Sequence, residues 1–304
     1  MTLRDMQYFY TIVQEKNITK AAAALFVAQP ALSQCVQKLE KELNVTLLIR
    51  TNNGVVPTAE GSCFFEFSHK MLLEQNIFEK ELNDIQNAES GKIIIGFTGT
   101  QATYVLPYFL PKFEAEHPNI QIILEEATSN DIEQLLSKGT IDVGIIHPPV
   151  FNTELDYFEL SRDHMVVVPR STSSYKDYIY QKKGSEFPYI DIEFLRNEPI
   201  AVTQPWQRSR IITEQIFTNA GFPPVYRQVS RNISTMDALA QINYATALIP
   251  QKQLSFPLQK RGFYLLDEAY DVPYSFYVAV KQGTYLSKAT LKLLAFLKNV
   301  RNTF

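Results

Sequence analysis

Cysteine and histidine are scarce in this chain of 304 residues, which contains two cysteines and four histidines. Cys35 and Cys63 are too few for a disulfide framework and too isolated for a zinc site. The histidines are scattered without metal-ligand spacing, and the sequence has no G-x-S-x-G, no P-loop and no dinucleotide-binding fingerprint. We therefore predict that the protein holds no metal and no cofactor, and that it is not an enzyme.

Long apolar runs are also missing. The first residues include Arg4 and Asp5 and lack the apolar core of a secretory signal, and no later run approaches the length of a membrane span. We therefore expect a protein of the reducing cytoplasm that has no contact with a membrane. The same observation disfavours a transport solute-binding protein, because such a protein would need a secretory signal.

Positive charge is not in excess. The formal net charge is −3 and the isoelectric point is about 5.9, whereas nucleic-acid binders are more often basic. Residues 1–60 carry six Lys and Arg against five Asp and Glu. A DNA-binding surface here must therefore depend on how its few basic residues are arranged. Its affinity for DNA would need more than one copy of the domain. The remaining composition, 45% hydrophobic and 20% charged, predicts two or three globular domains.

Residues 19–43 have the pattern of two helices joined by a tight turn. Thr19 can cap the first helix, which continues into four alanines, and Pro30 suits the first turn of the second because proline has no N–H to donate. The second helix has an apolar stripe at Leu32, Val36, Leu39 and Leu43. This arrangement predicts a helix-turn-helix.

The opposite face of the second helix is polar and weakly basic. Gln and Ser side chains match donors and acceptors in the major groove, while Lys and helix N-termini suit phosphates. An ordinary helical hairpin with a solvated polar face has the same periodicity, so the pattern alone leaves both interpretations open. In the DNA-binding interpretation, bases contact Gln29, Pro30, Ser33, Gln34 and Gln37, and phosphates or groove edges contact Thr19, Lys38 and Arg50.

Three further elements are predicted around this motif. Residues 2–15 form a helix capped by Thr2, and residues 44–58 alternate around Asn53-Gly54, which predicts a β-hairpin wing that carries Arg50. A simple surface hairpin is the alternative for the wing. From residue 60 to about 88 a long helix has heptad-spaced apolar residues, so we expect it to pair with a second copy of itself: Phe64, Met71, Phe78 and Ile85.

Beyond Gly91 short apolar strands alternate with helices, which predicts an α/β region with mostly parallel sheets. Ligands of such folds bind beyond the carboxyl ends of strands. The loops in that position carry Thr98, Thr100, Gln101, Ser129, Asn130, His147 and Thr203. Hydroxyl groups before a helix are at least as often caps as ligand contacts. Arg208 or Arg210 could supply positive charge, which favours an anionic ligand.

An ordered series of residues in the first 60 positions resembles the signature of LysR-type transcriptional regulators. It consists of Leu3, Phe9, Val13, Thr19, Ala21, Ala22, Leu25, Gln29-Pro30-Ala31-Leu32-Ser33, Leu39-Glu40, Leu43, Arg50 and Thr58-Ala59-x-Gly61. Ala28, Asn44 and Leu48 depart from the usual family residues, which affects the shape of the wing more than DNA binding.

The resemblance implies a winged helix-turn-helix domain (1–59), a linker and dimerisation helix (60–90) and an effector-binding domain (91–304). The effector domain would have two α/β lobes like a periplasmic binding protein, lobe I from about 91–162 and 268–304 and lobe II from about 163–267. The family's hydroxyl positions correspond to Thr100, Ser129 and Thr203.

The implied function is a transcriptional regulator that senses a small molecule between its lobes. The resemblance implies a homodimer or homotetramer on an imperfect inverted repeat of double-stranded DNA, with RNA polymerase as a further candidate partner. The alternative function is a cytoplasmic small-molecule-binding protein or enzyme with an accessory helix-turn-helix.

Overall fold

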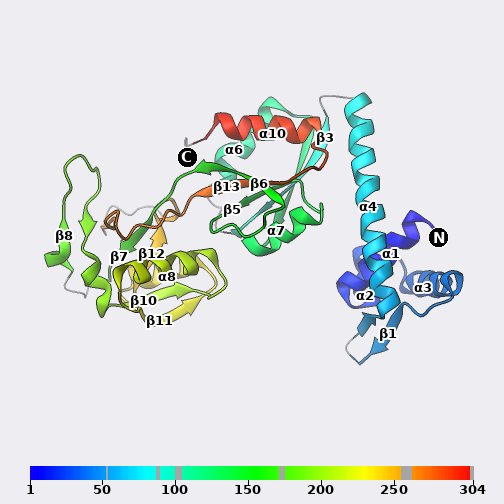
Figure 1. The fold of residues 1–304 in the computed structure, drawn as a ribbon, viewed down its shortest axis with the longest axis horizontal. Coiled ribbons are helices and arrows are strands. Elements are labelled where there is room, and N and C mark those ends of the chain that lie inside the picture. Colours follow the sequence, from blue (N-terminus) through cyan, green and yellow to red (C-terminus); the bar gives the residue numbers. More distant parts are fainter. Residues whose placement is uncertain (53, 87–89, 100–104, 171–174, 255–261, 302–304) are drawn as a thin grey trace. The chain divides into compact units, whose positions relative to one another are not determined.

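The computed structural model describes residues 1–52, 54–86, 90–99, 105–170, 175–254 and 262–301. The chain divides into two compact units, Met1–Gln86 and Asn87–Phe304, which we call the winged unit and the second unit. The winged unit contains α1 (Leu3–Glu15), α2 (Ile18–Ala24), α3 (Gln29–Leu43), β1 (Leu48–Thr51), β2 (Gly54–Pro57) and α4 (Ala59–Gln86), in blue to cyan in Figure 1.

Side-chain caps fix the starts of the first two helices. Thr2 caps α1 by accepting from the Asp5 N–H, while the Asp5 carboxylate accepts from the Thr2 N–H. The prediction that Thr19 caps α2 is wrong. Asn17 is the cap, because its Oδ1 reaches both the Thr19 and the Lys20 N–H groups, at 2.9 and 3.0 Å.

The core of the winged unit forms where α1, α3 and the wing meet, and its fully buried side chains include Phe9, Ile12, Leu32 and Leu39. Leu43, expected in the same stripe, is 39% exposed. It is the last residue of α3, and Asn44 then turns the chain away in the left-handed conformation. The apolar stripe therefore ends one turn earlier than the sequence predicts.

The β1–β2 hairpin forms the predicted wing, with Arg50 opposite Val55. Its second strand is fixed to the end of α1, because the Val55 N–H donates to the Lys16 carbonyl at 2.9 Å. A Cβ at Gly54 would lie 2.1 Å from that same carbonyl oxygen, so only glycine fits. A Cβ at Gly61, in the first turn of α4, would likewise lie only 1.9 Å from the Leu47 carbonyl oxygen.

The first sheet of the second unit has the order β4-β3-β5-β13-β6. Its strands are β3 (Gly91–Phe97), β4 (Ile120–Glu126), β5 (Val143–Ile146), β6 (Leu155–Ser161) and β13 (Phe276–Lys281). α6 (Leu106–Glu116) and α10 (Lys288–Asn299) cover one face and α7 (Ser129–Ser137) the other (Figure 1). We call this layered body lobe I.

The second sheet has the order β11-β10-β12-β7. Its strands are β7 (Met165–Val168), β10 (Pro199–Thr203), β11 (Val225–Ser230) and β12 (Thr246–Pro250). α8 (Arg208–Ala220) packs on one face and α9 (Ile233–Gln241) on the other. We call this body lobe II. The chain leaves lobe I after β6 and returns before β13, and the two crossing segments are joined by the Tyr274 N–H donating to the Asp163 carbonyl at 3.0 Å.

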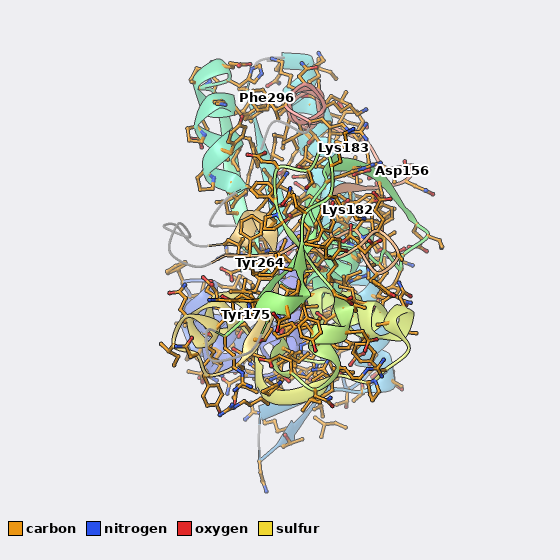
Figure 2. The ribbon with its side chains drawn as sticks, turned by 90° about the vertical axis from the view of Figure 1, so that its left-hand side faces the viewer. Asp156, Tyr175, Lys182, Lys183, Tyr264 and Phe296 are labelled. Carbon is orange, nitrogen blue, oxygen red and sulfur yellow. The ribbon has the colours of Figure 1, made fainter. Side chains whose placement is uncertain are left out.

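Two features of the second unit were not predicted. β6 was missed because its sequence, LDYFELS, has polar residues among the apolar ones, which is typical of a strand at the edge of a sheet. The second is a small antiparallel hairpin of β8 (Ile179–Tyr180) and β9 (Tyr189–Ile190). Near its base Tyr175 lies against Tyr264, with ring centroids 5.7 Å apart (Figure 2).

Candidate DNA-binding surface and effector cleft

The predicted recognition side chains lie together on one face of α3. Gln29, Pro30, Gln34 and Gln37 are exposed and Ser33 is half-buried. The Gln29 side-chain amide donates to the Ser33 hydroxyl at 3.0 Å, so these two polar groups already share one patch. Ala28 caps α3 without a side-chain bond, Pro30 in the first turn has no N–H, and the Ala31 N–H donates to the Ala28 carbonyl at 3.0 Å.

Lys38 lies on the same helix but is tied to α1. Its ammonium lies 2.9 Å from the Asp5 carboxylate. Burial acts to raise the pKa of Asp5. The contact with Lys38, together with hydrogen bonds from Thr2 and Cys35, outweighs burial and lowers this pKa to about 2. Burial and the nearby Asp5 charge raise the pKa of the Cys35 thiol to about 12, which makes the thiol unreactive near neutral pH.

Two other predicted contacts and one unpredicted residue lie outside α3. Thr19 is exposed on α2, and Arg50 is exposed on β1. Phe26, in the turn before α3, is 96% exposed and has a left-handed backbone with φ of 54°. Sequence reasoning missed Phe26, because an isolated aromatic residue in a turn gives no periodic signal.

The predicted effector residues on lobe I are only partly brought together. Thr98 follows β3 and is half-buried, while Thr100 and Gln101 lie outside the described residues. Ser129 is the first residue of α7 and is buried, but the cap of α7 is Thr128, which accepts from the Asp131 N–H. The cap interpretation of Ser129 is therefore wrong.

His147 follows β5 and is fully buried. Its Nδ1 lies 3.2 Å from the Ser275 carbonyl oxygen, and its ring stacks on Tyr274 with centroids 3.9 Å apart. Burial lowers its pKa to about 3, with the nearby positive charge of Arg208 acting in the same direction, so the ring is neutral near pH 7. Its Nε2 atom is buried and has no hydrogen-bond partner among the described residues.

Arg208 connects the two lobes. It is the first residue of α8 in lobe II, yet its Nη2 donates to Asn130 Oδ1 at 2.8 Å and lies 3.2 Å from Glu133 Oε1, both on α7 of lobe I. The guanidinium also lies over the Phe151 ring, 4.2 Å from its centroid. Arg208 and Glu133 are 4% and 5% exposed, so this is a buried ion pair across the cleft between the lobes.

Thr203 at the end of β10 faces the same helix end. Its hydroxyl bonds Ser209 Oγ at 2.7 Å, and its carbonyl accepts from Arg210 Nη1 at 3.2 Å. Thr203 is therefore not a helix cap, and the cap interpretation of this residue is wrong. Arg210 is directed to lobe II by an ion pair with Glu214 at 2.7 Å, so of the two arginines it is Arg208 that reaches lobe I.

A pocket of about 660 Å³ adjoins the interlobe ion pair. Its lining includes Asn130, Glu133 and Phe151, the three residues that contact Arg208, together with polar groups such as Gln134 and Ser137. Sequence reasoning found Asn130 and Arg208 but missed Glu133 and Phe151. Glu133 lies on the buried side of α7. In the sequence, a glutamate within an amphipathic helix indicates only a solvated surface charge.

Family models match both units of this chain. The model described as "Bacterial regulatory helix-turn-helix protein, lysR family" matches residues 3–62, and "LysR substrate binding domain" matches residues 86–302. The chain belongs to the LysR family. It is a DNA-binding transcriptional regulator with a substrate-binding effector domain, and the predicted fold class, family and function are confirmed.

Relatives of this LysR-family chain align over most of their length. It is 31% identical to the transcriptional regulator AlsR of Bacillus subtilis (strain 168) over 252 residues, which is 82% of this chain and 80% of that protein. It is 27% identical to BenM of Acinetobacter baylyi over 292 residues, or 94% and 93% of the two chains. Full-length CbnR complexed with its target DNA has the same fold, with a TM-score of 0.68, 19% identity and coverage of 98% and 99%.

Among the residues that the structure describes, no helix has the length and apolarity needed to cross a membrane.

Proposed function

We propose that this LysR-family regulator reads DNA with the exposed face of α3 and uses its wing to hold the DNA backbone. Gln29, Ser33, Gln34 and Gln37 offer side-chain donors and acceptors that match base edges. Thr19 suits a phosphate, and Lys38 can contribute only in part because Asp5 already pairs with it. The clustering of these polar groups on one helix face is the observation that carries the proposal.

The wing residue Arg50 gives a direct test of the backbone contact. We expect Arg50→Ala to weaken binding to all DNA sequences by a similar factor and to reduce the slope of log K against log salt by about 0.9, the value for one lost phosphate contact. The measurement is fluorescence anisotropy of labelled DNA at several salt concentrations, with specific and unrelated duplexes.

Arg162→Ala is the matched control, because Arg162 is an exposed arginine of the second unit. It should leave the salt slope unchanged. A loss in the Arg50 variant that is confined to one DNA sequence would show that Arg50 reads bases and would contradict the proposed role.

We also propose that α4 pairs with the α4 of a second copy, so that two winged units bind an imperfect inverted repeat. Along this 28-residue helix Phe78 is 61% and Ile85 is 81% exposed, and Leu82 is exposed on the same half. Exposed apolar residues at this spacing are typical of a helix that needs a partner helix. The family supports a homodimer or a homotetramer of two such pairs, with RNA polymerase as a candidate partner.

Substitution of the exposed apolar residues tests the pairing. We expect Phe78→Glu with Ile85→Glu to lower self-association at least tenfold in sedimentation equilibrium, because charges would replace apolar area in the interface. Gln86→Glu adds a charge to the same helix without removing apolar area and should associate like the unchanged protein. If the double variant associated as strongly as the unchanged protein, the dimer contact would lie elsewhere.

We propose that the effector binds between lobe I (about 91–162 and 268–304) and lobe II (about 163–267). Ser129, Asn130, His147, Thr203 and Arg208 line or approach this cleft, and Arg208 favours an anionic effector. Thr98, Thr100 and Gln101 remain proposed contacts. A ligand that changes how the lobes close would change the spacing of paired winged units and the bend of the DNA.

The proposed effector acts as a signal and is not chemically transformed. At a pKa of about 3, His147 is too weak a base to remove protons near neutral pH, which fits binding better than catalysis. Because its target is DNA, we propose that the protein acts in the cytoplasm.

A further inference from the structure

The Arg208 guanidinium has its hydrogen bonds concentrated on one nitrogen. Nη2 contacts both Asn130 Oδ1 and Glu133 Oε1, whereas Nε and Nη1 are buried and have no partner in the part of the chain that the structure describes. A guanidinium grips a carboxylate with two parallel N–H groups, and Nη2 belongs to both such pairs, Nε with Nη2 and Nη1 with Nη2. Asn130 and Glu133 therefore block both two-pronged grips at once.

The unpaired groups around this ion pair are donors or sites that a ligand can satisfy. Among the residues that the structure describes, the Arg208 Nε and Nη1 donors have no hydrogen-bond partner, and this side chain is at least nine-tenths buried. Buried polar groups in native proteins are nearly always hydrogen-bonded, and leaving one unpaired costs about 1–3 kcal/mol. The two Arg208 donors can therefore bind an acceptor that enters the site, whereas His147 Nε2 is itself an acceptor, because the ring donates from Nδ1 to the Ser275 carbonyl.

Glu133 can give up Arg208 without becoming unpaired. Its Oε1 lies 3.3 Å from the Phe151 N–H and 3.4 Å from the Tyr157 hydroxyl, and both of these donors belong to lobe I. Glu133, Asn130 and Phe151 also line the pocket of about 660 Å³ beside the ion pair, which is large enough for a small organic molecule. The carboxylate therefore keeps two hydrogen-bond donors of lobe I when Arg208 leaves it.

We propose that Glu133 is an internal substitute for the carboxylate of the effector. In the ligand-free protein it holds Arg208 and so joins the lobes, and a small organic acid displaces it by taking the two-pronged grip of Arg208. This inference rests on the proposed anionic effector and adds to it a competitor built into the chain. Glu133 lowers the affinity for the effector, so that the lobes change arrangement only above a threshold concentration.

A cationic effector bound to Glu133 is the competing explanation. It fits less well, because Glu133 already pairs with Arg208 and accepts from the Phe151 N–H and the Tyr157 hydroxyl, while the donors without a partner among the described residues are on Arg208. A cation would also be repelled by Arg208, which would itself lose its ion pair with Glu133.

The test measures binding of acetate and succinate to the full-length protein by calorimetric titration, with acetamide and succinamide as uncharged probes. We expect Glu133→Gln to bind at least one acid about tenfold or more tightly than the unchanged protein, and neither amide. Glu133→Asp keeps the charge but shortens the side chain, so it should also bind the acid more tightly. The matched control is Glu125→Gln, an exposed carboxylate on β4 of the same lobe.

The outcomes separate this inference from the proposed effector site. Equal or weaker acid binding by both Glu133 variants, together with loss of binding in Arg208→Met, would overturn the internal competitor and leave the anionic site in place. Acid binding that survives Arg208→Met would overturn both. No binding of either acid by the unchanged protein or by any Glu133 variant would likewise count against both.

Discussion

Ser33→Glu should abolish specific DNA binding, lowering the affinity by at least about 100-fold. Ser33 lies in the centre of the polar face of α3, one turn after Gln29, with which it shares a hydrogen bond. A carboxylate there would face base-edge acceptors and the phosphate backbone, and a like-charge contact of this kind costs several kcal/mol. Titration of labelled DNA that carries a selected high-affinity site measures the loss.

Ser234→Glu is the matched control for this variant. Ser234 is an exposed serine in the first turn of α9, where an acidic residue suits the helix N-terminus. It makes the same change in total charge far from α3 along the chain. Unchanged affinity in the Ser33 variant, with a folded protein, would show that α3 is not the recognition helix.

Arg208→Met should lower the free energy of unfolding of the second unit by about 3–5 kcal/mol. The substitution keeps an apolar stem near Phe151 but leaves the buried Glu133 carboxylate without its charged partner, and removing one member of a buried pair has a cost of this size. Denaturant unfolding of the full-length protein, followed by a signal from the second unit, measures the change.

Two variants show whether the charge is responsible. Adding Glu133→Gln to Arg208→Met removes the unpaired carboxylate and should recover more than half of the lost stability. Arg196→Met breaks an exposed pair with Glu193 and should lower the stability far less than Arg208→Met does. If the added Glu133→Gln gave no recovery, the loss would come from packing on Phe151 instead of from charge.

Local patterns in the sequence predicted most of the fold. The first helix and its Thr2 cap agree with the prediction, and so does the wing around Gly54, because proline, glycine and period-3.6 patterns act within a few residues. The cap of α2 was assigned to Thr19 because both Asn17 and Thr19 are good caps, and only the backbone geometry selects Asn17.

The candidate cleft was less accessible to sequence reasoning. The loops after β4, β5 and β10 were found because parallel strands place their carboxyl ends together, and this brought Asn130, His147 and Thr203 to attention. The ion pair between Arg208 and Glu133 joins residues 75 positions apart in different lobes, and no local pattern encodes such a contact. The burial of His147 beneath Tyr274 likewise depends on where the chain returns to lobe I.

The close approach of Gly54 to the Lys16 carbonyl and of Gly61 to the Leu47 carbonyl has a consequence for the thermodynamics of DNA recognition. Each end of the wing touches neighbouring backbone, so the hairpin has little freedom to move relative to α1 and α4. The conformational entropy of ordering this surface is therefore lost when the winged unit folds, before any DNA is met. A preformed surface of this kind can bind with little induced fit, and its mismatches with a non-specific sequence must be accommodated by the DNA.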